Sequence, residues 1–198
     1  ASNIKSTGSV TIASGNSERA TAGAIDIQVG GSTSAGNSVT ISAGSSTESA
    51  GGIASLNGGT GTAGGNVEVR SGAGSQSAGG AITIEAGSGV TSSTGGSVLI
   101  EGGEEGGRVS LTGGSAISKA SAGGDAVVAG GLSVKEGIGG DVHIMSGASV
   151  SGVSGSVFID TPASKSVGSG SVDISTGSSP SVSGDIAVKA GGGRIGGG

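Results

Sequence analysis

The sequence contains no cysteine, tryptophan or tyrosine, one phenylalanine (Phe158) and one histidine (His143). The lack of cysteine excludes a disulfide framework and thiolate metal sites, and a single histidine does not suffice for a zinc site. Large aromatic side chains usually dominate a globular core. Any core in this chain is therefore expected to be thin and built from Val, Ile, Leu and Ala.

Charge is also scarce, with 12% charged residues and a net charge of −5 at pH 7. Nucleic acid is not expected as a partner, because the 9 basic residues are scattered along an acidic chain. There is no apolar run long enough for a membrane span. The first ten residues lack the charged and apolar regions of a signal peptide. Since the repeat begins almost at residue 1, we expect a fragment of a longer chain.

Glycine is abundant, at 48 of 198 residues, which is typical of flexible linkers. Regularly spaced apolar residues and low charge argue against disorder. They form thirteen apolar–x–apolar triplets, each followed within a few positions by another glycine. The triplets occupy residues 10–12, 25–27, 39–41, 54–56, 67–69, 82–84, 98–100, 109–111, 126–128, 142–144, 157–159, 172–174 and 186–188.

The alternation within each triplet predicts a short strand with two side chains on one face and one on the other. The Gly- and Ser-rich segments between triplets predict tight bends. Stacking such units buries apolar surface that one unit cannot bury alone. We therefore predict an all-β fold, a parallel β-solenoid, over residues 1–198 as a single repetitive domain with a flexible Gly-rich tail at 190–198. A closed barrel and a β-sandwich are the less favoured alternatives.

The spacing of alternate triplets is steadier than that of neighbours, which favours two triplets per turn. We predict a flattened roll with two strands per coil of roughly 29 residues, and the alternative is a coil of roughly 14 residues. In the first arrangement Val67 stacks on Val98. The first and third residues of each triplet are expected to be buried, Val67, Val69, Ile82, Ile84, Val157 and Ile159 among the most deeply.

The middle residue of each triplet is expected to point outward. In the two-triplet coil, four apolar middle residues line up on one face and predict a self-association stripe: Leu99, Val127, Phe158 and Ala187. The other face is polar. Two opposite-charge pairs, Arg70 with Glu101 and Asp160 with Lys189, are expected to lie beside each other in successive coils.

No residue is predicted to be catalytic, to bind a cofactor or to hold a metal. His143 has an expected neighbour in Asp173, but a catalytic triad requires more than one such pair. The only dense acidic segment, 101–105, is read as a solvated turn. The GGD sequences at 123–125 and 139–141 lack the spacing of calcium-binding repeats. Outward Thr residues are too sporadic to favour ice binding. The sequence does not indicate an enzyme.

Two long stretches, GGNVEVRSGAGSQSAGGAITIEAGSG (64–89) and GSGSVDISTGSSPSVSGDIAVKAGGG (168–193), are the clearest examples of the repeat. They resemble the Gly/Ser-rich repeats of large surface proteins of diatoms and related algae, and they also look like bacterial repeat adhesins. The resemblance covers nearly the whole chain and lies in its composition. It implies a structural role at an extracellular location or on the cell surface, and it carries over no functional residue.

These observations predict a structural protein that assembles with copies of itself, head to tail or laterally, into an extracellular fibre, filament or surface coat. No capping element is evident at either end of the repeat. Open ends can join in a contact that does not close on itself. The alternative is an adhesin stalk or a surface-binding module, including an ice-binding face, with glycans or a surface as its partner.

Overall fold

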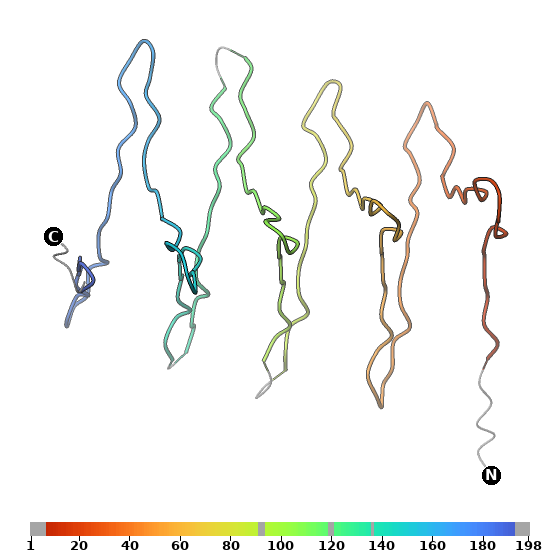
Figure 1. The fold of residues 1–198 in the computed structure, drawn as a ribbon, viewed down its shortest axis with the longest axis horizontal. Coiled ribbons are helices and arrows are strands. Elements are labelled where there is room, and N and C mark those ends of the chain that lie inside the picture. Colours follow the sequence, from red (N-terminus) through yellow and green to blue (C-terminus); the bar gives the residue numbers. More distant parts are fainter. Residues whose placement is uncertain (1–6, 91–93, 119–120, 136, 193–198) are drawn as a thin grey trace. The chain divides into compact units, whose positions relative to one another are not determined.

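The computed structural model describes residues 7–90, 94–118, 121–135 and 137–192, which follow extended segments and tight loops (Figure 1). These residues contain no helix and no β-strand. Among them, a single turn covers residues 104–106. The predicted all-β solenoid is therefore wrong, for the coil of two triplets and for its shorter alternative alike. A β-ladder requires hydrogen bonds between adjacent strands. In the described ranges, backbone hydrogen bonds join mainly the bases of loops and none joins two triplets.

The chain divides into two compact units, Ala1–Val98 and Leu99–Gly198. The division falls inside the triplet 98–100, so it does not coincide with an end of the repeat. Both units are built from the same alternation of extended segments and loops. The predicted flexible tail falls mainly on residues 193–198, which lie outside the described residues.

Eight loops are closed at their base by the same backbone hydrogen bond between two glycines. The donor is the N–H of the glycine two residues before a triplet. The acceptor is the carbonyl of the glycine five residues after the first residue of the preceding triplet. We call each such pair a neck, and the N–O distances are 2.8 or 2.9 Å. The necks, donor first, are Gly52–Gly44, Gly65–Gly59, Gly80–Gly72, Gly96–Gly87, Gly107–Gly103, Gly124–Gly114, Gly140–Gly131 and Gly155–Gly147.

The necks define a module of eight residues that runs from a donor glycine to the next acceptor glycine, for example GAITIEAG at 80–87. The sequence repeats this module thirteen times, and glycine occupies both ends except at Asn37 and Pro162. Where Pro162 replaces the acceptor glycine, the hydroxyl of Thr161 donates to the carbonyl of Gly170 at 3.0 Å. A side-chain bond therefore closes that loop in place of the backbone bond.

At four necks the donor must be glycine, because another backbone passes within 3.1 Å of the position that a Cβ atom would take; these donors are Gly65, Gly107, Gly124 and Gly140. A Cβ atom added at Gly140 would lie 2.9 Å from the backbone nitrogen of Gly131, and one at Gly65 would lie 3.0 Å from that of Gly59. The acceptor glycines differ, since a Cβ added at Gly131 or Gly59 would meet nothing within 4 Å. At these necks a side chain is thus excluded sterically at the donor glycine and not at the acceptor glycine.

In four necks the two backbones lie closer together than in the others. A further glycine stands immediately before the acceptor, and a Cβ there would overlap the carbonyl oxygen of the donor glycine; these glycines are Gly58, Gly102, Gly113 and Gly130. In other necks a small side chain fills this place. The Cβ of Ser71, for example, would lie 3.4 Å from a Cβ added at the donor Gly80. The doubled glycines therefore mark the closest approaches of the chain to itself.

In addition to the necks, hydrogen bonds to serine hydroxyls stabilise the loops. At one fixed loop position, seven residues after the first residue of a triplet, the serine hydroxyl accepts an N–H from two or three residues further along. This local bond competes well with water in turns. The pairs, hydroxyl first, are Ser17 with Ala20, Ser32 with Ser34, Ser46 with Ser49, Ser149 with Gly152, Ser164 with Val167 and Ser179 with Ser181.

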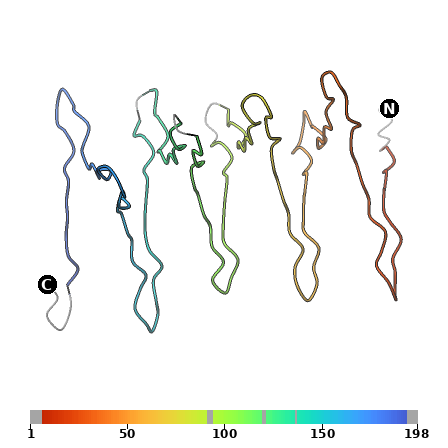
Figure 2. The ribbon, with the colours of Figure 1, turned by 90° about the horizontal axis from the view of Figure 1, so that it is seen from above.

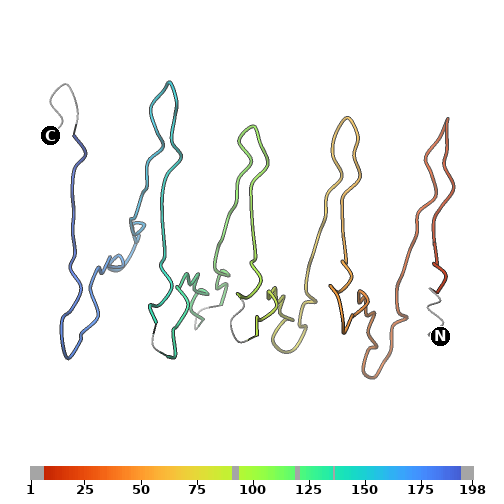
Figure 3. The ribbon, with the colours of Figure 1, turned by 90° about the horizontal axis from the view of Figure 1, so that it is seen from below.

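Within each unit, every third loop along the chain lies on the same side. In the first unit, loops 30–37 and 72–80 lie at the upper edge of Figure 1, and loop 44–52 lies at the lower edge. Loops 15–23 and 59–65 reach a further side, at the lower edge of Figure 2 and the upper edge of Figure 3.

The second unit has the same order, with loops 114–124 and 162–170 on one side and loop 131–140 on another (Figure 1). The structural repeat is therefore three modules, and the predicted repeat of two triplets is wrong. The sequence carries this period too. In one of the three series the triplets begin 44 residues apart, at Val10, Ala54, Val98, Val142 and Ile186, whereas the spacing in the other two series runs from 42 to 48 residues.

We predict that alanine at a donor glycine opens its neck, whereas alanine at the acceptor glycine does not. In Gly140→Ala the new Cβ meets the backbone of Gly131, and the bond that is weakened contributes about 1 kcal/mol. The amide of residue 140 should then exchange with solvent about fivefold faster. In Gly131→Ala its exchange should be unchanged. Equal acceleration in both variants, measured by residue-resolved hydrogen exchange, would contradict the steric account of the neck.

The shortest loop, 103–107, contains a strained residue. Glu105 has a φ of 60° and is followed by Gly106 at 90°. A left-handed conformation costs a residue with a side chain about 1–2 kcal/mol. We predict that Glu105→Gly slows amide exchange at Gly107 about fivefold, and that Glu105→Val accelerates it. Glu104→Gly is the matched control, because Glu104 lacks a positive φ. Slower exchange in that control would contradict the prediction.

Candidate functional site

The described residues enclose no cleft or cavity. They also contain no group of three His, Cys, Asp or Glu residues close enough to share a metal ion. A candidate site must therefore be sought on the surface of the modules and loops. Two surfaces carry the features that the sequence singled out, namely the charged side chains and the apolar triplets.

His143 lies in an extended segment beside Asp141. Its Nε2 atom is 3.8 Å from an oxygen of Asp141, and both side chains are at least 75% exposed. The two residues are two positions apart, so their side chains share one face of the segment. Asp173, the neighbour expected from the two-triplet coil, instead accepts a hydrogen bond from Ser171 at 3.4 Å. Within the described chain no serine hydroxyl contacts His143.

Arg70 forms an ion pair within its own module. Its guanidinium lies 3.1 Å from the carboxylate of Glu68, and both side chains are exposed. The sequence-based expectation placed Arg70 beside Glu101 of the next coil, and this is not what the structure contains. The same rule explains both observations, because residues two apart on an extended segment lie on one side. Charge pairing is therefore local.

The acidic and GGD sequences have structural positions in the loops. Glu104 and Glu105 form the turn at 104–106, in agreement with the expected solvated turn. In the GGD sequences the second glycines, Gly124 and Gly140, are neck donors. The GGD sequences thus mark a neck and the start of the module that follows it.

The apolar triplets are exposed throughout the described chain, and no apolar side chain is buried. The prediction that first and third residues are buried is wrong, since Val67 is 49% exposed and Val69 65%. The prediction that middle residues are exposed is confirmed for the largest of them, Phe158, at 86%. The first and third residues are not buried, because no backbone hydrogen bond joins one triplet to another in the described ranges.

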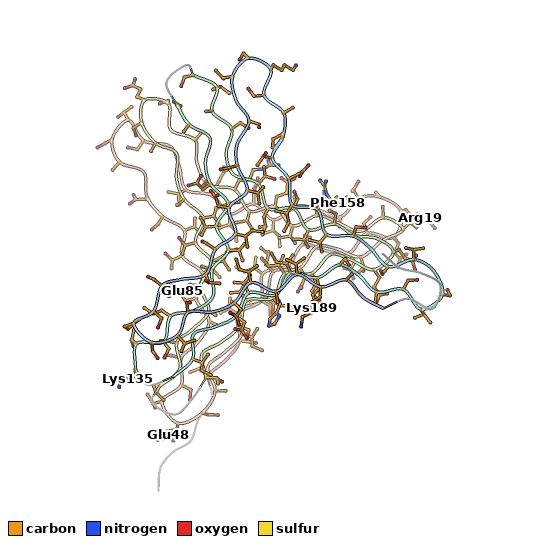
Figure 4. All side chains as sticks on the ribbon, turned by 90° about the vertical axis from the view of Figure 1, so that its left-hand side faces the viewer. Arg19, Glu48, Glu85, Lys135, Phe158 and Lys189 are labelled. Carbon is orange, nitrogen blue, oxygen red and sulfur yellow. The ribbon has the colours of Figure 1, made fainter. Side chains whose placement is uncertain are left out.

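The four residues of the predicted stripe are all exposed: Leu99, Val127, Phe158 and Ala187. Figure 4 labels Phe158, and it shows Arg19 and Glu48 of the first unit at loop ends that point in different directions. No partner covers the four residues within the chain. The self-association stripe stays a prediction.

The sequence analysis did not predict the necks, nor the loops in which a serine hydroxyl accepts a backbone N–H. The signal was present in the sequence, because glycine recurs at two fixed distances from each triplet and serine recurs at a third. Counting glycines as general bend formers hid those fixed positions. The pairing of one glycine with another across a loop of variable length was the missing inference.

In the part of the chain that the structure describes, there is no helix whose length and hydropathy would let it cross a membrane. The predicted absence of a membrane-spanning helix is therefore consistent with the described structure.

Comparison of the chain with models of protein families, with curated proteins and with solved structures finds no match.

Proposed function

We propose that the chain is a structural protein whose copies associate into an extracellular fibre, filament or surface coat. The observation that carries this proposal is the exposure of the apolar triplets. First residues of triplets such as Val67 and Val157 remain 49% and 47% exposed, and Ile84 and Ile159 remain 73% and 68% exposed. Exposed apolar surface on this scale marks a surface that another molecule covers.

The accessible area gives the size of the surface to be covered. The chain exposes 19743 Å², whereas a compact monomer of this mass exposes about 8,000 Å². The difference exceeds by several-fold the roughly 1,600 Å² that a standard protein–protein interface buries. One ordinary partner therefore leaves most of this surface in water. Repeated contacts with many copies along the chain can cover it.

The backbone of the modules supports the same conclusion. In the described ranges the necks use the amides and carbonyls at module ends, and the triplets between them have no backbone partner in the chain. Extended segments with free N–H and C=O groups add readily to another chain. Association of copies would thus bury apolar side chains and, at the same time, give backbone N–H and C=O groups hydrogen-bond partners.

Glycine makes association the favourable route to order. Glycine loses more conformational freedom on folding than any other residue, and it supplies 48 of 198 residues here. A chain that buries no side chain has little to offset this cost alone. Contacts between copies stabilise the ordered chain by mass action. The resemblance to Gly/Ser-rich surface proteins supports an extracellular or cell-surface location.

We predict that association depends on concentration. Sedimentation velocity should give a larger mean sedimentation coefficient as concentration rises, and electron microscopy of the concentrated protein should reveal filaments or sheets. A monodisperse monomer at every concentration would contradict the proposal and would leave the adhesin stalk or surface-binding module as the alternative.

The predicted stripe has its own test. Phe158→Ser should weaken association about 10- to 100-fold if the ring becomes fully buried between copies, because such burial contributes about 1.5–3 kcal/mol. Neck bonds should persist, since the ring is 86% exposed within the chain. His143→Ser is the matched control at another exposed middle position. Unchanged association of the Phe158 variant would exclude the stripe as a contact surface.

A further inference from the structure

Three series of modules run through the chain, because the repeat contains three modules. The first series has its triplets at Val10, Ala54, Val98, Val142 and Ile186, spaced by 44 residues each. Individual loops differ widely in length within these blocks. In the block 98–141, for example, the loop 103–107 is the shortest of the chain and the loop 114–124 is the longest, yet the block keeps its 44 residues.

The necks explain how loops can vary without disturbing the modules. Eight loops, the shortest (103–107) and the longest (114–124) among them, are closed by a bond of 2.8 or 2.9 Å whatever their length. The path of the backbone from one module to the next therefore depends on the neck and not on the loop. Counted between modules of the first series, the block keeps 44 residues although its single loops vary, and this indicates that the first-series modules are the part that is matched to something else.

Each side of a unit presents every third loop. In the first unit, loops 30–37 and 72–80 share a side, and loops 15–23 and 59–65 share another (Figures 1 and 2). A partner that lies along one side consequently meets equivalent loops, with the module ends that flank them, once in every block.

The acceptor glycines provide an independent observation. A Cβ added at any of the eight acceptors of the necks would meet nothing within 4 Å, and none of them has a positive φ. The chain's own packing therefore does not require glycine there, although glycine holds this place in all modules except that ending at Pro162. A missing side chain permits close approach of another backbone.

A second copy of this chain is the occupant that fits these features. Its modules recur at the same interval, so every contact made once is made again one block further along. The excess of exposed surface, 19743 Å² against about 8,000 Å² for a compact chain of this mass, requires such repeated contacts. A partner without a matching period would make one contact and leave the other blocks uncovered.

Resting on the proposed self-association, we infer that copies dock in a register set by the block of three modules. A module of one copy then meets a module of the same series in its neighbour, either aligned or displaced by whole blocks of 44 residues. Displacement by one block leaves unpaired modules at both ends, which bind further copies. The same contact therefore propagates into a filament.

Disulfide crosslinking of mixed variants tests this register, because the natural chain has no cysteine. Thr11→Cys and Ser55→Cys lie in middle positions of the first series, 44 residues apart, and both side chains are exposed. Thr83→Cys is the matched control, exposed in a middle position of another series. The three sites fall in different tryptic peptides, 6–19, 20–70 and 71–108. Mass spectrometry can therefore identify each crosslink.

Equimolar mixtures of two single-cysteine variants are assembled, with light scattering to monitor assembly, and then oxidised. Crosslinks within one series, either between positions 11 and 55 of displaced copies or between the same position of two aligned copies, should exceed those between positions 55 and 83 at least fivefold. Equal yields of crosslinks within a series and between positions 55 and 83 in assembled samples would overturn the block register and leave the proposed self-association standing. Absence of scattering at every concentration of the natural chain would overturn the proposed function and the register with it.

Discussion

A backbone hydrogen bond between two glycines, repeated at eight loop bases, is the interaction on which the rest of the structure depends. It forms because a donor glycine without a side chain lets two backbones approach closely, as at Gly140 and Gly131. The bond separates each loop from the module that follows it. Loops can therefore differ in length and sequence while the modules keep one form. Serine hydroxyls then fix the loop interiors by local bonds to backbone amides.

The same arrangement leaves the triplets uncovered. A neck holds two module ends together but brings no backbone against the apolar residues between them. Val and Ile side chains accordingly stay exposed, and the described chain has no buried apolar residue. Folding of one copy thus orders a glycine-rich backbone with little compensation from burial. Contacts between copies provide that compensation, which links the architecture directly to a structural, self-associating role.

Much of the local structure could be predicted from the sequence, whereas the fold could not. Alternation in a triplet such as 157–159 correctly predicts that its middle residue, Phe158, is exposed. It sets side-chain direction only, and it does not establish that a second segment lies about 4.8 Å away, as a sheet requires. The expected coil of two triplets failed for a related reason. Loop lengths vary so much that single gaps obscure the period, and in the sequence it is plain only in the series that begins at Val10, whose triplets are 44 residues apart.

Residue-resolved hydrogen exchange of the dilute and the assembled protein tests the central claim most directly. The necks are the backbone bonds of the single chain, so in dilute solution the amides of donor glycines such as Gly65 and Gly140 should be protected. Amides within the triplets, such as those of Val67 and Val69, should exchange freely there and become protected on assembly. Triplet amides that are already protected in the dilute monomer, more strongly than those of the donor glycines, would contradict the account.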